Sequence, residues 1–387
     1  MARIYKRGSK WEYAVELGKD ALGIRRRKVA GGFPTQKKAR EEATLVENEV
    51  INKTFINESD ISFSDYAEEW LKRYSLNVKV STVRVREHEV GHLKKQFKNL
   101  LLKDITKKRY QNILVAFKNI NCLAGNTIAG IHGTARMIFR EAVEFDLIKT
   151  DPTQYAKLPR EQQTIEDIES ADDIPEYMEK DELLRFLDFA KKGKEFDFII
   201  LLTLAYTGMR VGELCSLKWS DINFEDYIIS VTKTYYNPQN SIKKYMLLTP
   251  KTKASIRKIS ITDTILSELK LHRVRQAKDK MLYRDIWHDK DFVFTTKKHA
   301  GYPIYPKHVG NRMTAILRLS GLNQELTPHS LRHTHTSLLA EAGVGLEEIM
   351  ERLGHSDDEV TRKVYLHVTK TMKKEAAQKF DLLLNSP

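Results

Sequence analysis

The strongly apolar run at residues 196–206 constrains the fold more than any other feature of this sequence. A helix that crosses a bilayer needs about 20 apolar residues, and this run has about half that length. It therefore predicts a helix buried in the core of a globular domain. Thr207 and Gly208 follow at once and predict a tight turn into the next helix, with Arg210 just beyond it on a rigid base.

Length and charge limit the kinds of partner. A chain of 387 residues is expected to form two or three domains. Its net charge of +13 favours a polyanionic partner, although composition alone does not separate DNA from RNA or an acidic membrane surface. Two distant cysteines, Cys122 and Cys215, indicate a reducing compartment and argue against zinc clusters and disulfides. We find no signal peptide or lipidation motif, so a cytoplasmic protein without membrane contact is expected.

Residues 1–57 are expected to form a small domain of one short sheet and one helix. Trp11–Leu17 alternates apolar and polar residues, as a half-buried strand does, and Arg25–Ala30 would pair with it. Two glycines then break the pattern, and Thr35 is the expected N-cap of an amphipathic helix. The basic run of the second strand either is solvated or contacts DNA, and the nearby aromatic residues favour DNA contact. These candidates are Arg25, Arg26, Arg27 and Lys28.

Residues 58–159 are expected to form a bundle of four helices. Helical spacing of apolar residues begins at Phe63, and further helices are predicted from near Ser81, over residues 107–118, and from Asn126 until shortly before Pro152. The basic residues of this unit either solvate the bundle or contact phosphates as half of a clamp, and both readings stay open. The candidates are Lys79, Thr82, Arg84 and Arg86.

An acidic segment separates this bundle from a third domain. Residues 160–176 are rich in Glu and Asp and lack a hydrophobic period, which predicts a linker that would repel DNA. The third domain is expected over residues 177–387. Arg210 and Glu213 share a helix face there, either as a structural ion pair or with Glu213 orienting the guanidinium.

A strand and a hairpin are predicted in the middle of the third domain. Residues 227–233 alternate as a strand, and residues 247–259 predict a hairpin, so a small antiparallel sheet is expected. Lys251 and Lys253 share one strand face in this hairpin, and alternation does not distinguish them.

The last candidates lie toward the end of the chain. A Thr-Pro pair predicts a helix start that puts His329 and Arg332 on one face near a helix N-terminus, where a phosphate is favoured. His355 lies just past another predicted helix end, and Tyr365 follows ten residues later. His333 and His335 suggest a metal site together with His329, but no Glu or Cys completes the spacing, so no metal is expected.

Taken in order, these side chains suit the transfer of a phosphodiester to a tyrosine. The transition state is strongly anionic, and an arginine stays charged and can hold two phosphate oxygens at once. A phenol, with an ordinary pKa of about 10, needs deprotonation or a cationic setting, and the leaving hydroxyl needs a general acid. Two arginines, a lysine, two histidines and a tyrosine meet these demands without a metal or another cofactor.

In this order the motifs resemble the catalytic domain of the tyrosine recombinases, the lambda-integrase-type integrases, over roughly residues 177–370. Residues 1–57 and 58–159 resemble the arm-binding and core-binding domains of that family. The matching strings are Thr207-Gly208-Met209-Arg210 with Glu213-Leu214, Pro250-Lys251-Thr252, His329-Ser330-Leu331-Arg332-His333, Leu353-Gly354-His355-Ser356 and Val364-Tyr365-Leu366-His367-Val368.

The resemblance implies a role for each member of the set. Tyr365 would attack the scissile phosphate to give a 3′-phosphotyrosine, while Arg210 and Arg332 would hold the phosphate oxygens. Lys251 would be the general acid, with Lys253 in reserve. The residues that would handle protons or brace the phosphate are His329 and His355.

The resemblance also implies a multidomain, mainly α fold. It would have a small N-terminal β-sheet plus helix domain, a helical core-binding bundle, and a mostly α catalytic domain with a small antiparallel sheet. The protein would integrate and excise a phage or other mobile element as a homotetramer on core and arm sites in double-stranded DNA. The resemblance leaves room for an excisionase or a host DNA-bending protein, and for a C-terminal tail that packs on its own domain or on a neighbour.

Two alternatives compete with an integrase. Chromosome-dimer resolvases as a group usually lack a basic front domain such as residues 1–57, which disfavours that class. A DNA-binding regulator without cleavage activity would have no need of Tyr365.

Overall fold

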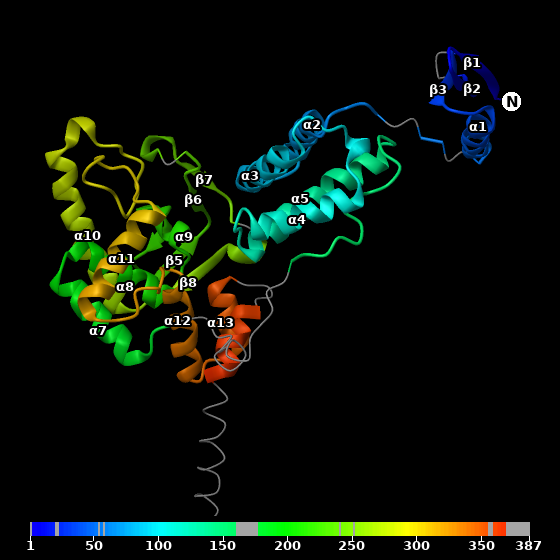
Figure 1. The fold of residues 1–387 in the computed structure, drawn as a ribbon. Coiled ribbons are helices and arrows are strands. Elements are labelled where there is room, and N and C mark those ends of the chain that lie inside the picture. The colour runs from blue at the N-terminus through cyan, green and yellow to red at the C-terminus, as the bar shows by residue number, and fades with distance from the viewer. Residues whose placement is uncertain are drawn as a thin grey trace, which may run out of the picture. The chain divides into compact units, whose positions relative to one another are not determined.

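A computed structural model describes residues 2–19, 23–52, 55–56, 59–159, 177–239, 241–250, 252–354 and 359–368, apart from the side chains of Lys19 and Lys253. The chain forms two compact units, residues 1–162 and residues 163–387. Figure 1 draws the helices and strands of both units. Both units contain helices and small antiparallel sheets, and helices dominate, which confirms the predicted fold class. The predicted linker at residues 160–176 falls outside the described residues.

The described part of residues 2–52 is an antiparallel sheet in the order β1-β2-β3, with helix α1 against it. Tyr13 and Val15 of β2 are buried on one face together with Ala43 of α1, as the alternation of β2 predicts. Thr35 is the N-cap of α1, and its side chain accepts a hydrogen bond from the Lys38 N–H at 3.3 Å. The elements are β1 (Arg3–Arg7), β2 (Lys10–Lys19), β3 (Arg25–Phe33) and α1 (Gln36–Ile51).

Two details of this sheet differ from the prediction. The sequence predicts a pair of strands, but β1 adds an edge strand whose two apolar residues are too few to set a period. The glycines at 31 and 32 are expected to end the second strand, yet β3 continues through them to Phe33. A register shift opposite Trp11 and Tyr13 accommodates them, and Gly32 takes a φ of 92° there.

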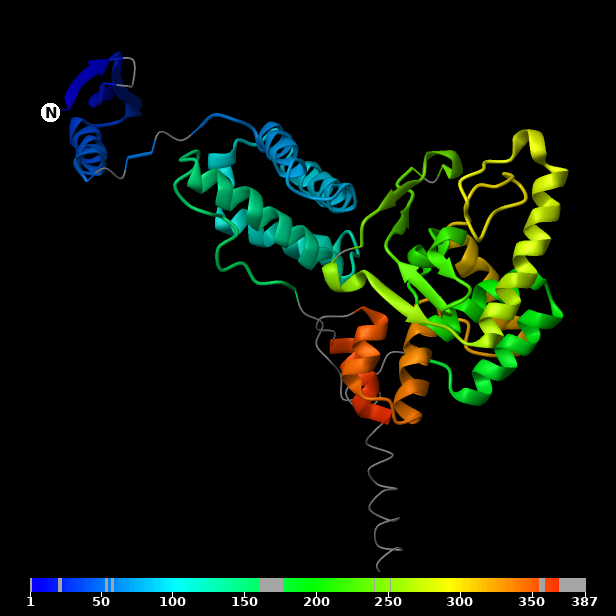
Figure 2. The same cartoon turned by 180° about the vertical axis from the view of Figure 1, so that it is seen from behind.

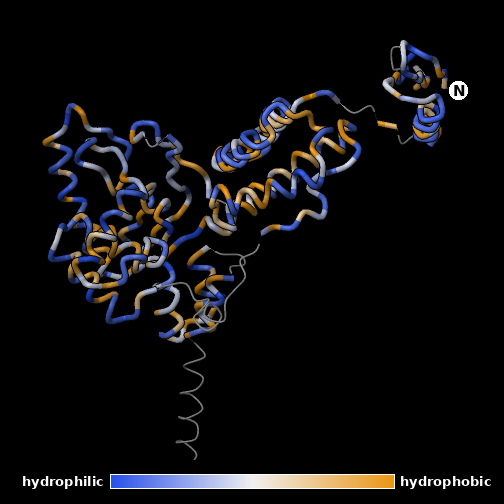
Figure 3. The backbone as a smooth tube through the Cα atoms, in the orientation of Figure 1, coloured by the Kyte–Doolittle hydropathy of each residue, from blue (hydrophilic) through white to orange (hydrophobic). Residues whose placement is uncertain are grey.

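Residues 59–159 form a bundle of four helices, as predicted. Aromatic rings fill its centre, and the ring of Phe63 lies 4.6 Å from that of Phe97 and 5.5 Å from that of Phe139. Hydrophobic residues recur with the helical turn along these helices (Figure 3). The elements are α2 (Phe63–Ser75), α3 (Val80–Phe97), the 3-10 turn η1 (Leu102–Asp104), α4 (Lys107–Asn119) and α5 (Gly125–Glu144).

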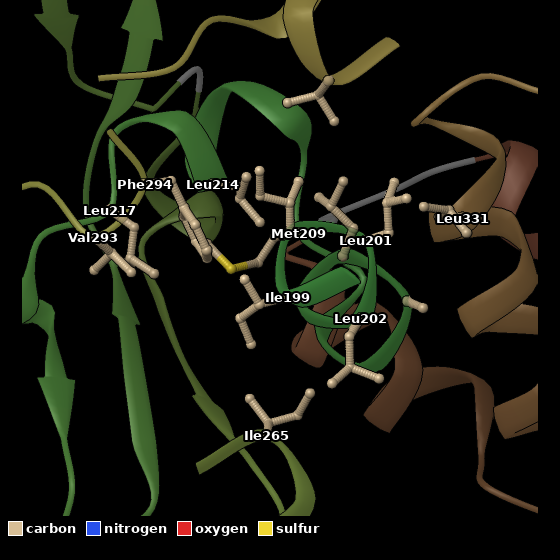
Figure 4. Close-up of a cluster of buried hydrophobic side chains, with 14 of the residues drawn as sticks. Ile199, Leu201, Leu202, Met209, Leu214, Leu217, Ile265, Val293, Phe294 and Leu331 are labelled. Atoms are coloured by element: carbon tan, nitrogen blue, oxygen red, sulfur yellow. The ribbon is translucent and has the colours of Figure 1, made fainter. Parts of the chain in front are cut away.

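Helix α8 (Glu195–Thr207) is the centre of the second unit, and most of its side chains are buried. Helices α7, α10, α11 and α12 pack around it, so the apolar run is a core helix, as predicted. Figure 4 shows Ile199, Leu201 and Leu202 of α8 within this core. Among the described helices, none has both the length and the apolarity that crossing a bilayer requires.

Further helices of the second unit lie before and after its sheets in sequence. Residues 359–368 are also helical. The helices are α7 (Lys180–Lys192), α9 (Val211–Cys215), α10 (Asp263–Leu282), α11 (Pro306–Ser320), α12 (Ser330–Glu341) and α13 (Leu346–Leu353).

The predicted hairpin over residues 247–259 is wrong. Strand β7 pairs with β6, whereas β8 pairs with β5, so the two arms of the expected hairpin lie in different sheets (Figure 2). Ile229 and Ile259 stand opposite each other and are fully buried, so burial against the core sets this pairing rather than closeness in sequence. The strands are β4 (Ile222–Asn223), β5 (Ile228–Val231), β6 (Thr234–Tyr236), β7 (Met246–Leu248) and β8 (Arg257–Ser260).

Candidate active site

The turn between α8 and α9 is built on Gly208. This residue ends α8 with a φ of 61°, a left-handed conformation that favours glycine. A Cβ at this position would come within 2.7 Å of His335 Cδ2 and of Leu353 Cδ2. Arg210 follows at the start of α9, as predicted, and its side chain is 37% exposed. The turn therefore combines tight packing on one side with an accessible guanidinium on the other.

Arg332 joins three helices at this turn. It lies on α12 and is buried, and its Nη1 donates to the Gly208 carbonyl at 2.7 Å. Its Nη2 donates to the Leu353 carbonyl at the end of α13, also at 2.7 Å. A bidentate hold of this kind fixes the guanidinium plane. Arg332 therefore lies within bonding distance of a residue two positions from Arg210.

Glu213 is the buried carboxylate of the site. Its Oε2 accepts from the Arg210 N–H at 3.0 Å, and its Oε1 accepts from Arg210 Nη1 at 3.1 Å. Arg257 bonds the same two oxygens at 2.9 Å and 3.3 Å. Burial alone would raise the pKa of Glu213, but the hydrogen bonds and charge of Arg257, followed by those of Arg210, hold the pKa below its ordinary value. Glu213 is thus an ionised anchor between two arginines.

Arg257 belongs to the site, although the sequence reasoning does not single it out. It lies on β8, and its Nε donates to the Arg352 carbonyl at 2.8 Å. Alternation along β8 puts it on the same buried face as Ile259. An arginine on the core-facing side of a strand needs a buried partner, and that pattern was the available signal.

His335 is held as a neutral imidazole. Its Nε2 accepts from Arg352 Nε at 3.0 Å, so its Nδ1 carries the proton and donates to the Ala205 carbonyl at 2.9 Å. Burial, followed by the charge of Arg352, lowers the pKa of His335 to about 3. Both ring nitrogens are occupied within the fold, and His335 is therefore a structural residue. His329 is exposed, and its ring lies 4.7 Å from that of His333.

Tyr365 lies on the helical segment 359–368 and is half-buried. It packs in a small apolar cluster with Ile349 and Leu353 of α13 and Ala340 of α12. Leu353 is the residue whose carbonyl holds Arg332. The predicted nucleophile therefore belongs to the same junction of helices as the predicted phosphate-binding arginines.

Lys251 and His355 lie outside the described residues, as does the side chain of Lys253. Their neighbours in sequence are in contact. A Cβ on Gly354 would come within 2.9 Å of the Ala254 carbonyl oxygen, and the Gly354 φ is 72°. The Ser255 hydroxyl also donates to the Gly354 carbonyl at 3.5 Å. The backbone that follows Lys253 therefore meets the backbone that precedes His355.

The candidate DNA contacts lie on two parts of the first unit. Arg25–Arg27 are exposed on β3, while Lys28 is half-buried. Lys79 and Arg84 are exposed at and after the start of α3, and Thr82 is half-buried. The exposed members of this set, Arg25–Arg27, Lys79 and Arg84, are accessible to a polyanion.

Arg86 is engaged inside the helical bundle. Its Nη1 donates to Glu89 at 2.7 Å and to the Thr134 hydroxyl at 3.0 Å, and that hydroxyl donates to Glu89 in turn. Glu89 and Thr134 are buried. The arginine side chain that the sequence offers as a phosphate contact thus also neutralises a buried carboxylate between α3 and α5.

Comparisons with known proteins cover nearly the whole chain. The Phage integrase family matches residues 176–372, the Phage integrase, N-terminal SAM-like domain matches residues 62–117, and the Arm DNA-binding domain matches residues 3–54. The integrase of Staphylococcus phage L54a is 28% identical over 88% of this chain and 98% of its own length. The ICEBs1 integrase of Bacillus subtilis (strain 168) is 27% identical over 93% of each chain.

Solved structures of integrases share the fold. The Tn1549 transposon integrase in complex with transposon right end DNA superposes with a TM-score of 0.65 at 20% identity, over 82% of this chain and 100% of that one. A lambda integrase tetramer bound to a Holliday junction gives a TM-score of 0.55 at 17% identity, over 93% and 94% of the two chains. The chain therefore belongs to the phage integrase family, the lambda-type tyrosine recombinases, and is a site-specific integrase.

Proposed function

We propose that Tyr365 is the nucleophile of this integrase. Its phenolic oxygen attacks the scissile phosphate and forms a 3′-phosphotyrosine, while the bond to the 5′ oxygen breaks. The phenol gives up its proton, and the departing 5′ oxygen takes one from a general acid. Attack by the 5′ hydroxyl of another strand reverses the step and joins the new strands. The observation that carries this proposal is the junction of α8, α9, α12 and α13, which holds Arg210 and Arg332 and includes the cluster with Tyr365.

Arg210 and Arg332 supply the positive charge that the anionic transition state requires. Lys251 is the general acid that we propose, with Lys253 in reserve, and Glu213 supports Arg210. His329 and His355 handle protons or brace the phosphate. In this scheme the energy of the broken bond is kept in the phosphotyrosine, so neither ATP nor a metal is required.

Different segments of the chain have different roles on DNA in this proposal. We assign arm-type sites to residues 1–57, the core site to residues 58–159, an acidic linker to residues 160–176, and catalysis to residues 177–387. Exposed basic residues on β3 and α3 support the first two assignments. A homotetramer would bring two core sites together, and an excisionase or host DNA-bending protein would set the direction of recombination. Because its substrate is element and host DNA, we place the enzyme on the nucleoid in the bacterial cytoplasm.

A suicide DNA substrate with a nick near the cleavage position tests the nucleophile. Wild type is expected to form a covalent protein–DNA adduct on denaturing electrophoresis, and Tyr365→Phe is expected to form none. Tyr206→Phe is the matched control, because Tyr206 is a partly exposed tyrosine of the same unit. An adduct that persists in Tyr365→Phe would contradict the assignment. A wild type that binds DNA without any adduct would favour a non-cleaving regulator.

Removal of residues 1–57 tests the arm assignment. The shortened chain is expected to lose binding to distal arm sites and to keep measurable binding to the core site. Equal loss at both sites would mean that this segment has a structural role. Full recombination without residues 1–57 would favour the chromosome-dimer resolvase alternative.

A further inference from the structure

Arg257 is a buried arginine that the proposed chemistry does not use. Its side chain is 5% exposed. Its guanidinium donates to both oxygens of Glu213, to the Arg352 carbonyl at 2.8 Å and to the Ser255 carbonyl at 3.2 Å. These bonds join β8, α9 and the end of α13. An arginine so fully engaged has a fixed position.

The carboxylate of Glu213 is shared evenly between two arginines. Each of its oxygens accepts one hydrogen bond from Arg210 and one from Arg257. The side chain of Arg210 bonds only Oε1, through Nη1, because the bond to Oε2 comes from the Arg210 backbone N–H. The buried fork of Arg257 holds both oxygens and thereby sets the plane in which Arg210 is bound.

Arg257 also contacts the end of α13, which holds Arg332. Its Nε bonds the Arg352 carbonyl, and the next carbonyl, that of Leu353, accepts from Arg332 Nη2 at 2.7 Å. Two successive carbonyls at the end of α13 thus each accept a hydrogen bond from a different arginine. A shift of Arg257 would therefore be transmitted to both phosphate-binding arginines.

We propose that Arg257 is a positioning residue of this integrase. It keeps Arg210 and Arg332 at a fixed spacing by clamping Glu213 on one side and the end of α13 on the other. This inference rests on the proposed function, because it requires the two arginines to hold the scissile phosphate. A lysine at this position would keep the charge, but its single ammonium lacks the planar fork that spans two oxygens.

Arg257→Lys is the test variant, since a retained positive charge avoids an unpaired buried carboxylate. Arg312→Lys is the matched control. Arg312 bonds the buried Asp197 through Nε at 2.7 Å and Nη2 at 2.6 Å, in the same unit but at α8 and α11. Both variants are measured for DNA affinity and for the rate of covalent adduct formation in a single turnover at saturating DNA.

We expect Arg257→Lys to form adduct on the order of 100-fold more slowly than wild type, since small misplacements at a reacting centre cost about that much. Its DNA affinity should stay within about twofold of wild type, and the adduct rate of Arg312→Lys within about threefold. An adduct rate for Arg257→Lys that matches Arg312→Lys would overturn the positioning role. A wild type without adduct would instead overturn the proposed function, and this inference with it.

A second substrate separates positioning from general loss of structure. A methylphosphonate at the scissile position removes the negative charge that the arginines must neutralise, so their exact placement matters less. The deficit of Arg257→Lys should shrink to about tenfold or less on this substrate. An equal deficit on both substrates would mean that Arg257 supports the fold rather than the phosphate-binding arginines, and would overturn the proposal.

Discussion

Buried His335 makes the second unit sensitive to acid. Burial and the charge of Arg352 lower its pKa to about 3 in the folded chain, against an ordinary value of about 6.5. Between these two values the unfolded chain binds a proton that the folded chain does not, so a fall in pH favours unfolding. The stability that the neutral ring contributes is complete above about pH 6.5 and is lost progressively as the pH falls toward about 3.

The magnitude follows from the two pKa values. At about pH 5 the unfolded histidine is almost fully protonated and the folded one is almost fully neutral, which costs about 2 kcal/mol of stability. That loss corresponds to about a 30-fold rise in the equilibrium constant for unfolding. The carboxylates titrate mainly below this pH, so the comparison stays above about pH 5.

Cys215 provides an assay that reports only the second unit. It is 1% exposed in the core around α8, and Cys122 is exposed, so a Cys122→Ser background leaves one buried thiol. The labelling rate of Cys215, divided by that of the unfolded chain at the same pH, gives the opening equilibrium. Between about pH 7.5 and pH 5 this equilibrium should rise about 30-fold more in the His335 protein than in His335→Gln.

His335→Gln is the matched variant because glutamine keeps a donor and an acceptor but does not titrate. Its stability is expected to stay nearly constant over this pH range, so the stability difference between the variant and wild type should change by about 2 kcal/mol between about pH 7.5 and pH 5. The same pH dependence in both proteins would refute the reasoning. It would mean that His335 is protonated in the folded state or that its bonds to Ala205 and Arg352 do not form.

Gly208→Ala is expected to destabilise the second unit by about 2–5 kcal/mol, because the cost of a left-handed φ and the cost of an overpacked contact add together. Urea unfolding followed by Cys215 labelling measures this loss of stability. A loss below about 1 kcal/mol would contradict the packing around Gly208. Glu213→Gln is expected to cost about 3–5 kcal/mol because it leaves a buried arginine without its carboxylate, and wild-type stability in the same assay would refute that anchor role. In the first unit, Arg84→Ala should reduce the slope of log affinity against log salt by about 1 with little change in stability. Arg86→Met should instead lower stability by about 3 kcal/mol, since Glu89 stays buried; thermal unfolding together with DNA titration distinguishes the two variants, and the reverse pattern would contradict the structure.

Much of the fold was predictable because its signals are local. The apolar run that became α8, the Thr-Gly turn and the helical periods of the first unit each lie within about 20 residues. Such signals depend on side-chain spacing and on backbone preferences of a few residues. They also place Arg210 beside Glu213, since residues three positions apart lie on the same face of a helix.

Strand pairing was harder to predict. Closeness in sequence favours a hairpin over residues 247–259, but β8 pairs with β5 because both present an isoleucine to the core. Strand β1 has too few apolar residues for their pattern to predict a strand. Pairing energy comes from cross-strand contacts and burial, and neither is visible in one strand alone.

The sequence by itself determined the kind of chemistry. The order of two arginines, two histidines, a lysine and a tyrosine along the chain points to one reaction class, the transfer of a phosphodiester to a tyrosine. The sequence already offered Glu213 as a support for Arg210, and only the tertiary structure added Arg257 to it. Glu213 and Arg257 are 44 residues apart, and Arg332 reaches a carbonyl 124 residues away. The physical reason is that a buried charge takes its partner from whatever the folded core brings within reach, and distance along the chain has no bearing on that choice.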